Sequence, residues 1–381
     1  MQFLGIVFGG VAAFFPDKLD WALDNWGEAG QPSEGLSHWP TDFSGDVHPV
    51  ACHSHNDYWR KVPLYSAIHA GCVSVEADVW LFDEELYVGH SLSSLTPNRT
   101  LSSLYINPLL DILEKQNPVS NFHPKMDSPP AGVFDMAPSQ TLILLIDYKT
   151  SGKALHPYVI QQLDPLRQKG YLTHFNGTDV VEGPITIVAT GNAPFDLVMQ
   201  NTTYRDVFFD APLDQMEDKS DGSISDPYVD SLDSTRDHLP ANPYSPYIEA
   251  ATSIKPLPSA PTAIAYGDAD QGQGHSGGAP LNPSVYSPSN SYYASVSFSR
   301  SIGFPWRSRL SARQLEKIRK QIRGAHAQGL KVRYWSLPAW PRGLRNHIWH
   351  ILVREGVDVL NVDDLVGATR RDWRKTKGWW H

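Results

Sequence analysis

The stretch Thr141-Leu-Ile-Leu-Leu-Ile-Asp-Tyr-Lys-Thr150 constrains the fold more than any other part of this chain. A continuous apolar run bounded by turn residues is typical of a strand that is covered on both faces in a parallel sheet. Shorter apolar strands alternate with amphipathic helices about eight times along the sequence. This alternation predicts a parallel sheet with helices outside it, and a (β/α)8 TIM barrel, with some irregularity, is its natural closure. A doubly wound open sheet is the alternative, but no glycine-rich phosphate turn follows the first strand.

The domain organisation follows from composition along the 381 residues. Residues 1–48 form an apolar segment and an irregular lead-in, and residues 49–381 are expected to form the barrel. The region 213–291 is rich in Ser, Pro, Asp, Gly and Tyr and has little periodicity, which indicates a long loop insertion. The net charge of −9, without a block of like charge, argues against nucleic-acid binding.

Two features bear on the cellular location. Residues 3–15 are apolar and long enough for a signal-peptide core but short for a membrane span, and they lack a positively charged start. They are therefore a signal, part of an anchor, or a buried first element. Sequons at Asn98, Asn176 and Asn201 favour the secretory route, so we expect a secreted or membrane-anchored glycoprotein.

The two cysteines, Cys52 and Cys72, fall on neighbouring strands of the expected sheet. Strict alternation of side chains places Cys52 away from His53 and Cys72 on the side of Glu76. Cysteines on opposite faces of a sheet do not meet the geometry of a disulfide, so we expect two buried thiols.

Glu76 and Asp78 are two positions apart in a valine-rich strand. Residues two apart on a strand point to the same side, so the two carboxylates project together. Adjacent carboxylates repel, and one of them must be protonated unless a cation lies between them. Hard cations such as Mg²⁺ and Ca²⁺ prefer oxygen ligands of this kind. Solvated residues on an edge strand are the alternative, but the flanking valines favour burial, and buried carboxylates need partners.

Further chemical groups stand at the ends of other predicted strands. Asp147 adds a third carboxylate, and Lys149 shares its side of the strand, where it can bind an anion or serve only as the partner of Asp147. His55 and His90 also end strands. Because barrel enzymes carry their chemistry at the C-terminal ends of the strands, these positions predict one shared site.

The order His55, Glu76-x-Asp78, His90 and Asp147-x-Lys149 resembles that of the phospholipase-C-like phosphodiesterases. This superfamily includes the glycerophosphodiester phosphodiesterases and the spider-venom phospholipase D toxins. The stretches 53–58, 74–80 and 208–212 are most similar to the fungal "altered inheritance of mitochondria" branch, and the resemblance covers residues 49–365.

The resemblance implies a divalent metal ion, Mg²⁺ first, with Ca²⁺ and Mn²⁺ as alternatives. It implies that Glu76, Asp78 and Asp147 are the metal ligands. It implies catalytic roles for His55, His90 and Lys149, and it places Trp335 in a wall of the substrate pocket. The neighbouring candidates for substrate contact are His53, Asn56, Asp57 and Arg60.

Two positions depart from the glycerophosphodiesterase pattern. Those enzymes follow the first histidine with a phosphate-binding arginine, where this chain has Asn56 and Asp57 after His55. They have His-Asp where this chain has His90-Ser91. These departures weaken the case for glycerophosphodiester substrates but leave phosphodiester chemistry in place. His53 and His55 point to the same side, and the spacing to Glu76 favours His55 as the catalytic member.

We therefore expect a metal-dependent phosphodiesterase that acts on a phospholipid or another small phosphodiester, by hydrolysis or by transfer to a cyclic phosphate. A membrane surface is a further expected partner. One rival is a non-catalytic barrel that serves as a binding or membrane-tethered module. Another is a glycoside hydrolase with carboxylates at the barrel end, although the two histidines and Lys149 fit that chemistry poorly.

Overall fold

Eight parallel strands close into a barrel in the computed structural model, which describes residues 44–121, 124–125, 127–218, 279–305, 309–371 and 373. Their order is β1-β11-β10-β9-β8-β7-β4-β2, and pairing of β1 with β2 closes the ring. This confirms the predicted (β/α)8 TIM barrel. The strands are β1 (Val50–Ser54), β2 (Cys72–Phe82), β4 (Leu142–Tyr148), β7 (Ile185–Gly191), β8 (Val207–Pro212), β9 (Ser291–Ser297), β10 (Lys331–Trp335) and β11 (Val359–Val362).

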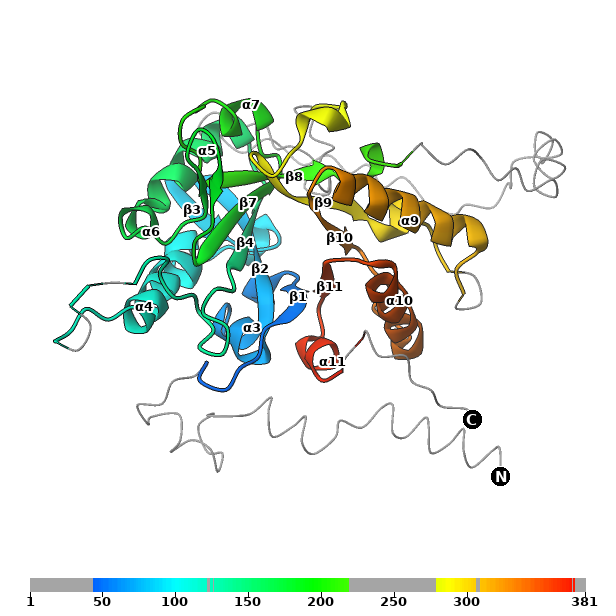
Figure 1. Cartoon of the computed structure of the whole chain (residues 1–381), viewed down its shortest axis with the longest axis horizontal. Helices are drawn as coiled ribbons and strands as arrows, with labels where there is room; N and C mark the ends of the chain where they lie inside the picture. The colour runs from blue at the N-terminus through cyan, green and yellow to red at the C-terminus, as the bar shows by residue number, and fades with distance from the viewer. Residues whose placement is uncertain are drawn as a thin grey trace, which may run out of the picture.

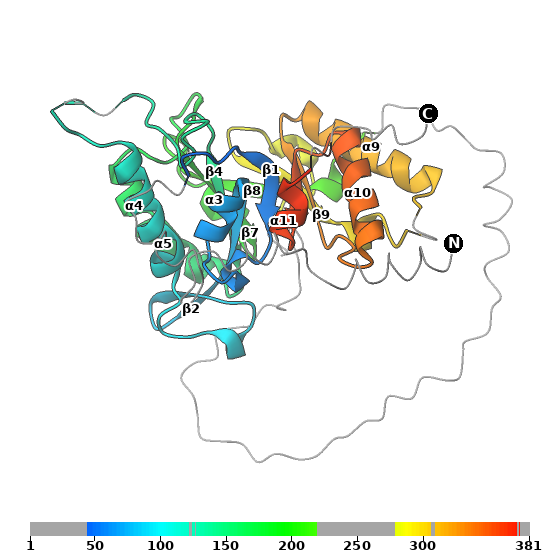
Figure 2. The same cartoon turned by 90° about the horizontal axis from the view of Figure 1, so that it is seen from below.

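Helices surround the strands, with α4 and α5 on one side of the barrel and α9 and α10 on the other (Figures 1 and 2). The α-helices are α3 (Tyr65–Ala70), α4 (Asn107–Gln116), α5 (Gly152–Gln162), α6 (Asp164–Gln168), α7 (Phe195–Val198), α8 (Phe298–Ser301), α9 (Ala312–Ala327), α10 (Arg342–Glu355) and α11 (Leu365–Thr369). A π-helix, η4, spans Ser102–Ile106. Short 3-10 turns are η2 (Asp57–Trp59), η3 (Leu92–Ser94), η5 (Leu213–Gln215) and η7 (Pro283–Val285).

Local sequence signals account for the main elements. All seven residues of β4 are buried, as its apolar run predicts. At the start of α9, the side chain of Ser311 accepts from the backbone amide of Gln314, and the side chain of Gln314 accepts from the backbone amide of Ser311. This reciprocal capping box satisfies amide groups that have no partner within the helix. Gly356 ends α10 with φ of 102°, a conformation that glycine adopts without steric cost.

A hairpin leaves the barrel after β2. Strand β3 (Glu85–Val88) pairs antiparallel with the distal half of β2 and therefore does not belong to the ring. The chain after β3 returns to the C-terminal end of the barrel, where the Gly89 amide donates to the Asp78 carbonyl at 3.1 Å. His90 thus lies in a loop beside the barrel mouth rather than on a strand. A second small sheet pairs β5 (His174–Phe175) with β6 (Val180–Val181).

The expectation of two free thiols is wrong, because Cys52 and Cys72 form a disulfide with a Cα–Cα distance of 4.8 Å. The parallel pairing of β1 with β2 shifts by one residue between Val50 and His53. Such an irregularity breaks the strict alternation of side chains. Alternation was the premise that placed the two cysteines on opposite faces, so the local shift removes that objection.

The barrel interior contains a buried ionic network below the mouth. Arg333 on β10 is fully buried and donates to Ser295 at 3.2 Å, to Asn361 at 2.8 Å and to Asp210 at 3.4 Å. Burial raises the pKa of Asp210, while the Arg333 guanidinium opposes that rise. A paired charge network of this kind keeps the interior polar without leaving an isolated buried charge.

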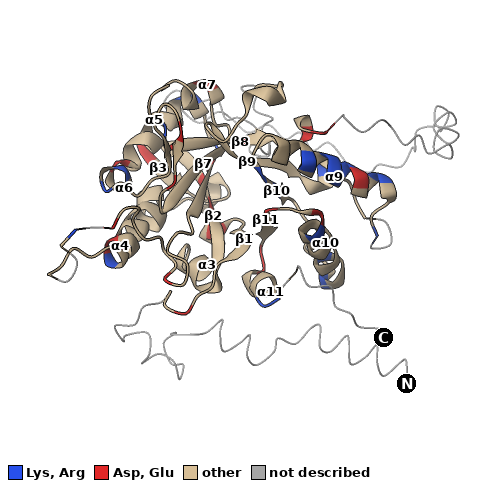
Figure 3. Cartoon of the chain, in the orientation of Figure 1, with Lys and Arg blue, Asp and Glu red and all other residues tan. Residues whose placement is uncertain are grey.

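Several cations on the outer helices are paired with acids. Figure 3 shows Lys and Arg along α9. Its side chains form ion pairs with acids on neighbouring segments, namely Lys317–Glu217, Arg319–Glu355 and Arg323–Asp218. This mixed surface agrees with the expectation that the chain does not bind nucleic acid, which stays a prediction.

The predicted insertion 213–291 has well-packed ends. Leu213 and Met216 after β8, and Tyr286 before β9, are buried in the core. Residues 219–278 lie outside the described part of the chain, as do residues 1–43 of the expected lead-in, so both assignments stay predictions. Among the described residues, no helix has the length and apolar character needed to cross a membrane.

Candidate functional site

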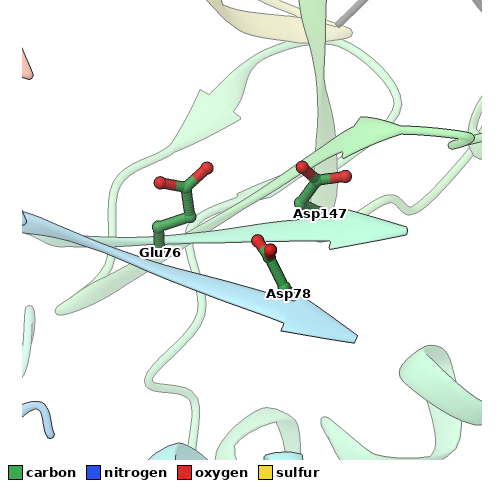
Figure 4. A group of neighbouring side chains, drawn as sticks. All are labelled: Glu76, Asp78 and Asp147. Atoms are coloured by element: carbon green, nitrogen blue, oxygen red, sulfur yellow. The ribbon is translucent and has the colours of Figure 1, made fainter. Parts of the chain in front are cut away.

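Three buried carboxylates meet at the C-terminal end of the barrel. Glu76 and Asp78 come from β2 and Asp147 comes from β4, and one oxygen from each lies within 4.8 Å of the other two. Figure 4 shows the three side chains on the same side of these adjacent strands. The structure therefore brings together all three predicted metal ligands.

Strand register explains this convergence. Asp78 is the direct partner of Asp147 in the parallel pairing of β2 with β4, and Glu76 projects to the same side two residues earlier. On the next strand, Gly191 has φ of 64°, and a Cβ atom there would come within 1.9 Å of Asp147 Oδ1. Only glycine at this position leaves room for the Asp147 carboxylate.

The pKa values of Glu76 and Asp147 are shifted by burial and by nearby charged groups. Burial raises the pKa of Asp147 to about 6; Lys149 opposes the rise and Asp78 adds to it. For Glu76, burial acts to raise the pKa, but the nearby His55 and His53 outweigh burial, so the pKa of Glu76 lies well below its usual value. The site therefore gathers negative charge that only cationic neighbours can balance.

The donor set fits a hard divalent cation. The ligands are all carboxylate oxygens, the type that Mg²⁺ and Ca²⁺ prefer. Asp78 is buried, and its Oδ1 atom has no hydrogen-bond partner among the described residues. Buried polar atoms are rarely left without a partner, so this oxygen is available to a cation.

His55 lies next to the carboxylates, and one of its ring nitrogens is hydrogen-bonded to Asp363. Its Nδ1 atom lies 2.8 Å from Asp363 Oδ1, and its Nε2 atom lies 3.9 Å from Glu76 Oε2. The imidazole is 27% exposed, so it is open to a ligand at the mouth. Burial lowers the pKa of His55, but the Glu76 and Asp363 carboxylates outweigh it and raise the pKa above its usual value.

His90 approaches a different carboxylate, Asp78. Its Nδ1 atom lies 3.7 Å from Asp78 Oδ2, and its side chain is 54% exposed. Tyr58 lies between them: its hydroxyl donates to Asp78 Oδ2 at 2.7 Å and lies 3.3 Å from His90 Nδ1. The structure thus places the two predicted acid–base histidines beside two different carboxylates of the cluster.

His53 is fully buried beneath the site, unlike His55. Its Nδ1 atom lies 2.6 Å from Ser74 Oγ and its Nε2 atom 3.4 Å from Glu76 Oε2. Burial lowers the pKa of His53 to about 4, so the ring is neutral near pH 7. This placement favours support of Glu76 over the predicted substrate contact.

Lys149 carries the only positive charge that contacts the carboxylates among the described Lys and Arg side chains. Its Nζ atom lies 2.7 Å from Asp147 Oδ2 and 3.2 Å from Asp78 Oδ2. Burial lowers the pKa of Lys149, but Asp147 and Asp78 outweigh it, so the pKa lies above its usual value and the ammonium stays charged.

The remaining predicted contacts have varied surroundings. Asp57 is fully buried, and its carboxylate accepts from Ser54, from the Leu64 amide and from Tyr105, which favours a role in holding the loop after β1. Arg60 donates to the backbone carbonyls of Val362 and Asp363 and so ties this loop to β11. For these two residues, substrate contact stays untested.

Asn56 contacts the carboxylates, and Trp335 lies at the C-terminal end of another barrel strand. Asn56 has a left-handed backbone conformation, and its backbone N–H donates to Glu76 Oε2 at 3.1 Å. Trp335 ends β10 half-buried, and its buried Nε1 atom has no hydrogen-bond partner within the described part of the chain. An unpartnered indole N–H at a strand end suits the wall of a polar pocket.

Sequence reasoning missed three contributors. Tyr58 lies within the stretch 53–58 and had no predicted role, although it bonds to Asp78 of the carboxylate cluster. Asp363 directly follows the last strand, and its position at a strand end was the available signal. No local signal marks Gly191, because the need for glycine arises from the Asp147 side chain of another strand.

Comparison with known proteins identifies the family. The chain is 37% identical over 338 residues to "Altered inheritance of mitochondria protein 6 homolog" of Arthroderma benhamiae, covering 87% of this chain and 86% of the relative. The chain belongs to this family. The altered inheritance of mitochondria protein 6 of Eremothecium gossypii is 32% identical over 326 residues, covering 84% of this chain and 68% of the relative. Residues 41–210 match the AIM6-like phosphodiesterase domain, which indicates a phosphodiesterase family. No solved structure matches the chain significantly.

The expected secretory location is wrong on this comparison. The family members are named for altered inheritance of mitochondria, and that name contradicts secretion. N-glycosylation of Asn98, Asn176 and Asn201, which was expected on the secretory route, loses its basis with it.

Proposed function

We propose that this protein cleaves a phosphodiester bond at the C-terminal end of the barrel with the help of one divalent cation. The observation that carries the proposal is the set of buried carboxylates of Glu76, Asp78 and Asp147 beside two accessible histidines. The family model supports the phosphodiesterase class. The substrate is a phospholipid or another small phosphodiester.

His55 suits the general base. Because Asp363 accepts a hydrogen bond from Nδ1–H, the Nε2 atom carries the lone pair and faces the carboxylate site. In the reaction, Nε2 takes the proton from the attacking hydroxyl as its oxygen bonds to phosphorus. The attacking hydroxyl belongs to water in hydrolysis, and to the substrate itself in formation of a cyclic phosphate.

His90 suits the general acid. As the bond between phosphorus and the leaving oxygen breaks, His90 delivers a proton to that oxygen, so the leaving alcohol departs neutral. The Lys149 ammonium, held by Asp147 and Asp78, adds positive charge next to the phosphoryl oxygens. A cation bound by Glu76, Asp78 and Asp147 would supply Lewis-acid stabilisation of charge on the phosphate.

The test combines chelation with a conservative substitution. Turnover of bis(p-nitrophenyl) phosphate and of phospholipid substrates by the full chain is measured first in the presence of a chelator. It is measured again after addition of Mg²⁺, Mn²⁺ or Ca²⁺. We expect chelator to abolish turnover and one of these ions to restore it. Glu76→Gln should lose both turnover and metal binding by calorimetry, because the amide removes an anionic ligand without changing its size.

Asp111→Asn is the matched control, since Asp111 is an exposed acid on α4, outside the barrel. It should behave as the wild type. Full turnover in excess chelator contradicts the metal requirement, and metal binding without turnover of any phosphodiester favours a non-catalytic barrel. Phosphorus NMR of the product distinguishes hydrolysis from cyclic phosphate formation.

A further inference from the structure

Four of the large exposed apolar side chains lie on loops near the C-terminal ends of the barrel strands. We call Trp59, Leu92, Phe304 and Trp340 the apolar rim; they are 60%, 46%, 75% and 77% exposed. Single exposed apolar residues are ordinary, but several gathered around one opening mark an interaction site. Whether the four side chains gather around one opening depends on which strands they follow.

All four side chains belong to the mouth of the barrel that holds the carboxylates. Trp59 follows β1, Phe304 follows β9 and α8, and Trp340 follows β10. The C-terminal ends of parallel barrel strands share one face, so the loops after them share it too. Leu92 follows His90, where the chain has returned from the β2–β3 hairpin.

Direct contacts connect these loops to the site and to each other. The Trp59 ring lies 4.7 Å from the His90 ring, centre to centre. Ser299 and Ser336 are 2.9 Å apart through their hydroxyls, which joins the loop of Phe304 to the loop of Trp340. A small cleft of about 70 Å³ includes both His55 and Leu337, three residues before Trp340.

Cations flank the rim on the side formed by the loops after β1, β9 and β10. Lys61, Arg300 and Arg342 are exposed and lie two to four residues from Trp59, Phe304 and Trp340, respectively. Among the described residues of these loops the acid is the buried Asp57, and in the adjacent loop after β11 Asp363 pairs with His55 and Asp364 with Arg345, so cations outnumber exposed acids here. In a chain with net charge −9, this local positive character complements an anionic surface.

We propose that the mouth of the barrel docks on an anionic lipid surface through the apolar rim. Tryptophan and phenylalanine side chains beside cations are the groups that bind at the interface between lipid headgroups and acyl chains. Lysine and arginine add attraction to anionic headgroups within a short distance of the surface. Docking in this orientation opens His55 and His90 directly to the lipid. The proposal is independent of the proposed function, because binding needs no turnover.

Vesicle flotation of the full chain tests the proposal. The probes are vesicles of phosphatidylcholine alone and of phosphatidylcholine with phosphatidylglycerol. We expect the wild type to float with the anionic vesicles, and the Phe304→Ala and Trp340→Ala variants each to bind about tenfold more weakly, as loss of one inserted aromatic side chain predicts. Lys61→Glu together with Arg342→Glu should remove the preference for phosphatidylglycerol.

Leu281→Ala is the matched control. Leu281 is also 77% exposed but precedes β9, at the opposite end of the barrel, so this variant should bind as the wild type does. All variants keep the apolar residues 3–15, so any contribution of that segment is constant.

Three outcomes overturn the proposal. One is wild-type protein that stays unbound, and another is rim variants that float as well as the wild type. The third is a wild-type dimer in gel filtration that Trp340→Ala dissociates while no vesicle binding occurs, which assigns the rim to a second copy of the chain. Circular dichroism of each variant verifies that the fold is intact.

Discussion

His55 Nδ1 lies 2.8 Å from Asp363 Oδ1, although 308 positions separate the two residues in the chain. The contact exists because the first and last strands of the barrel are neighbours: β1 pairs with β11, and His55 and Asp363 follow those strands. A carboxylate on one ring nitrogen fixes both the orientation of the imidazole and the position of its proton.

Replacement of Asp363 by Asn should therefore impair proton transfer more than binding. We expect kcat to fall by about a hundredfold with a smaller change in KM, because the amide no longer holds the required tautomer of His55. Asp358→Asn is the control, since Asp358 forms an equally short 2.8 Å pair with His326 outside the site. Steady-state kinetics of both variants measure the difference, and equal kcat values for Asp363→Asn and the wild type contradict this role.

Tyr58→Phe should weaken metal binding while it preserves the fold. The hydroxyl is within hydrogen-bond distance of Asp78 Oδ2 and of Asn56 Oδ1, and its loss frees the Asp78 carboxylate to rotate. Groups that orient ligands in this way typically contribute about tenfold or more to affinity. Isothermal titration with Mg²⁺ or Mn²⁺ measures the change.

The control is Tyr148→Phe, which removes a buried hydroxyl that instead contacts His156. If both tyrosine variants bind the cation as the wild type does, the hydroxyl of Tyr58 does not position Asp78.

Stability should fall as the pH drops below about 6.5, the pKa of an unperturbed histidine. Burial lowers the pKa of His156 in the folded state, so below pH 6.5 the unfolded chain binds more protons than the folded chain. The free energy of unfolding then decreases with falling pH until the folded-state pKa is passed, and it is insensitive to this group above pH 6.5.

Urea unfolding of the wild type and of His156→Gln at several pH values isolates this effect. His53, with its pKa lowered to about 4, contributes in the same direction in both proteins, so the difference between them reports on His156. A wild type and variant with identical pH dependence would show that His156 titrates alike in both states.

Reduction of the Cys52–Cys72 disulfide should destabilise the barrel by about 3 kcal/mol, the chain-entropy expectation for a loop of this length. The bond joins β1 to β2 across a sequence separation of 20 residues. Urea unfolding with and without reductant measures the loss. Cys52→Ser should match the reduced wild type and should itself be insensitive to reductant; two reactive thiols in the non-reduced wild type contradict the bridge.

Local patterns along the chain were enough to predict the class of fold and most of the candidate site. The apolar run that became β4 and the regular alternation of strands with helices predicted the barrel, because burial on both faces and helical spacing are local properties. The two-residue spacing of Glu76 and Asp78 predicted shared projection for the same reason. The three predicted ligands indeed converge, since strand ends in a parallel barrel meet on one face.

The register of the strands against one another could not be predicted from local patterns. A one-residue shift between β1 and β2 allowed the disulfide that strict alternation excluded. The pairing of β1 with β11 brought Asp363 to His55, and the approach of β7 to β4 required glycine at position 191. Periodicity reports which face of its own strand a side chain occupies. Contacts between strands depend on their relative offset, which the packing of the whole barrel sets.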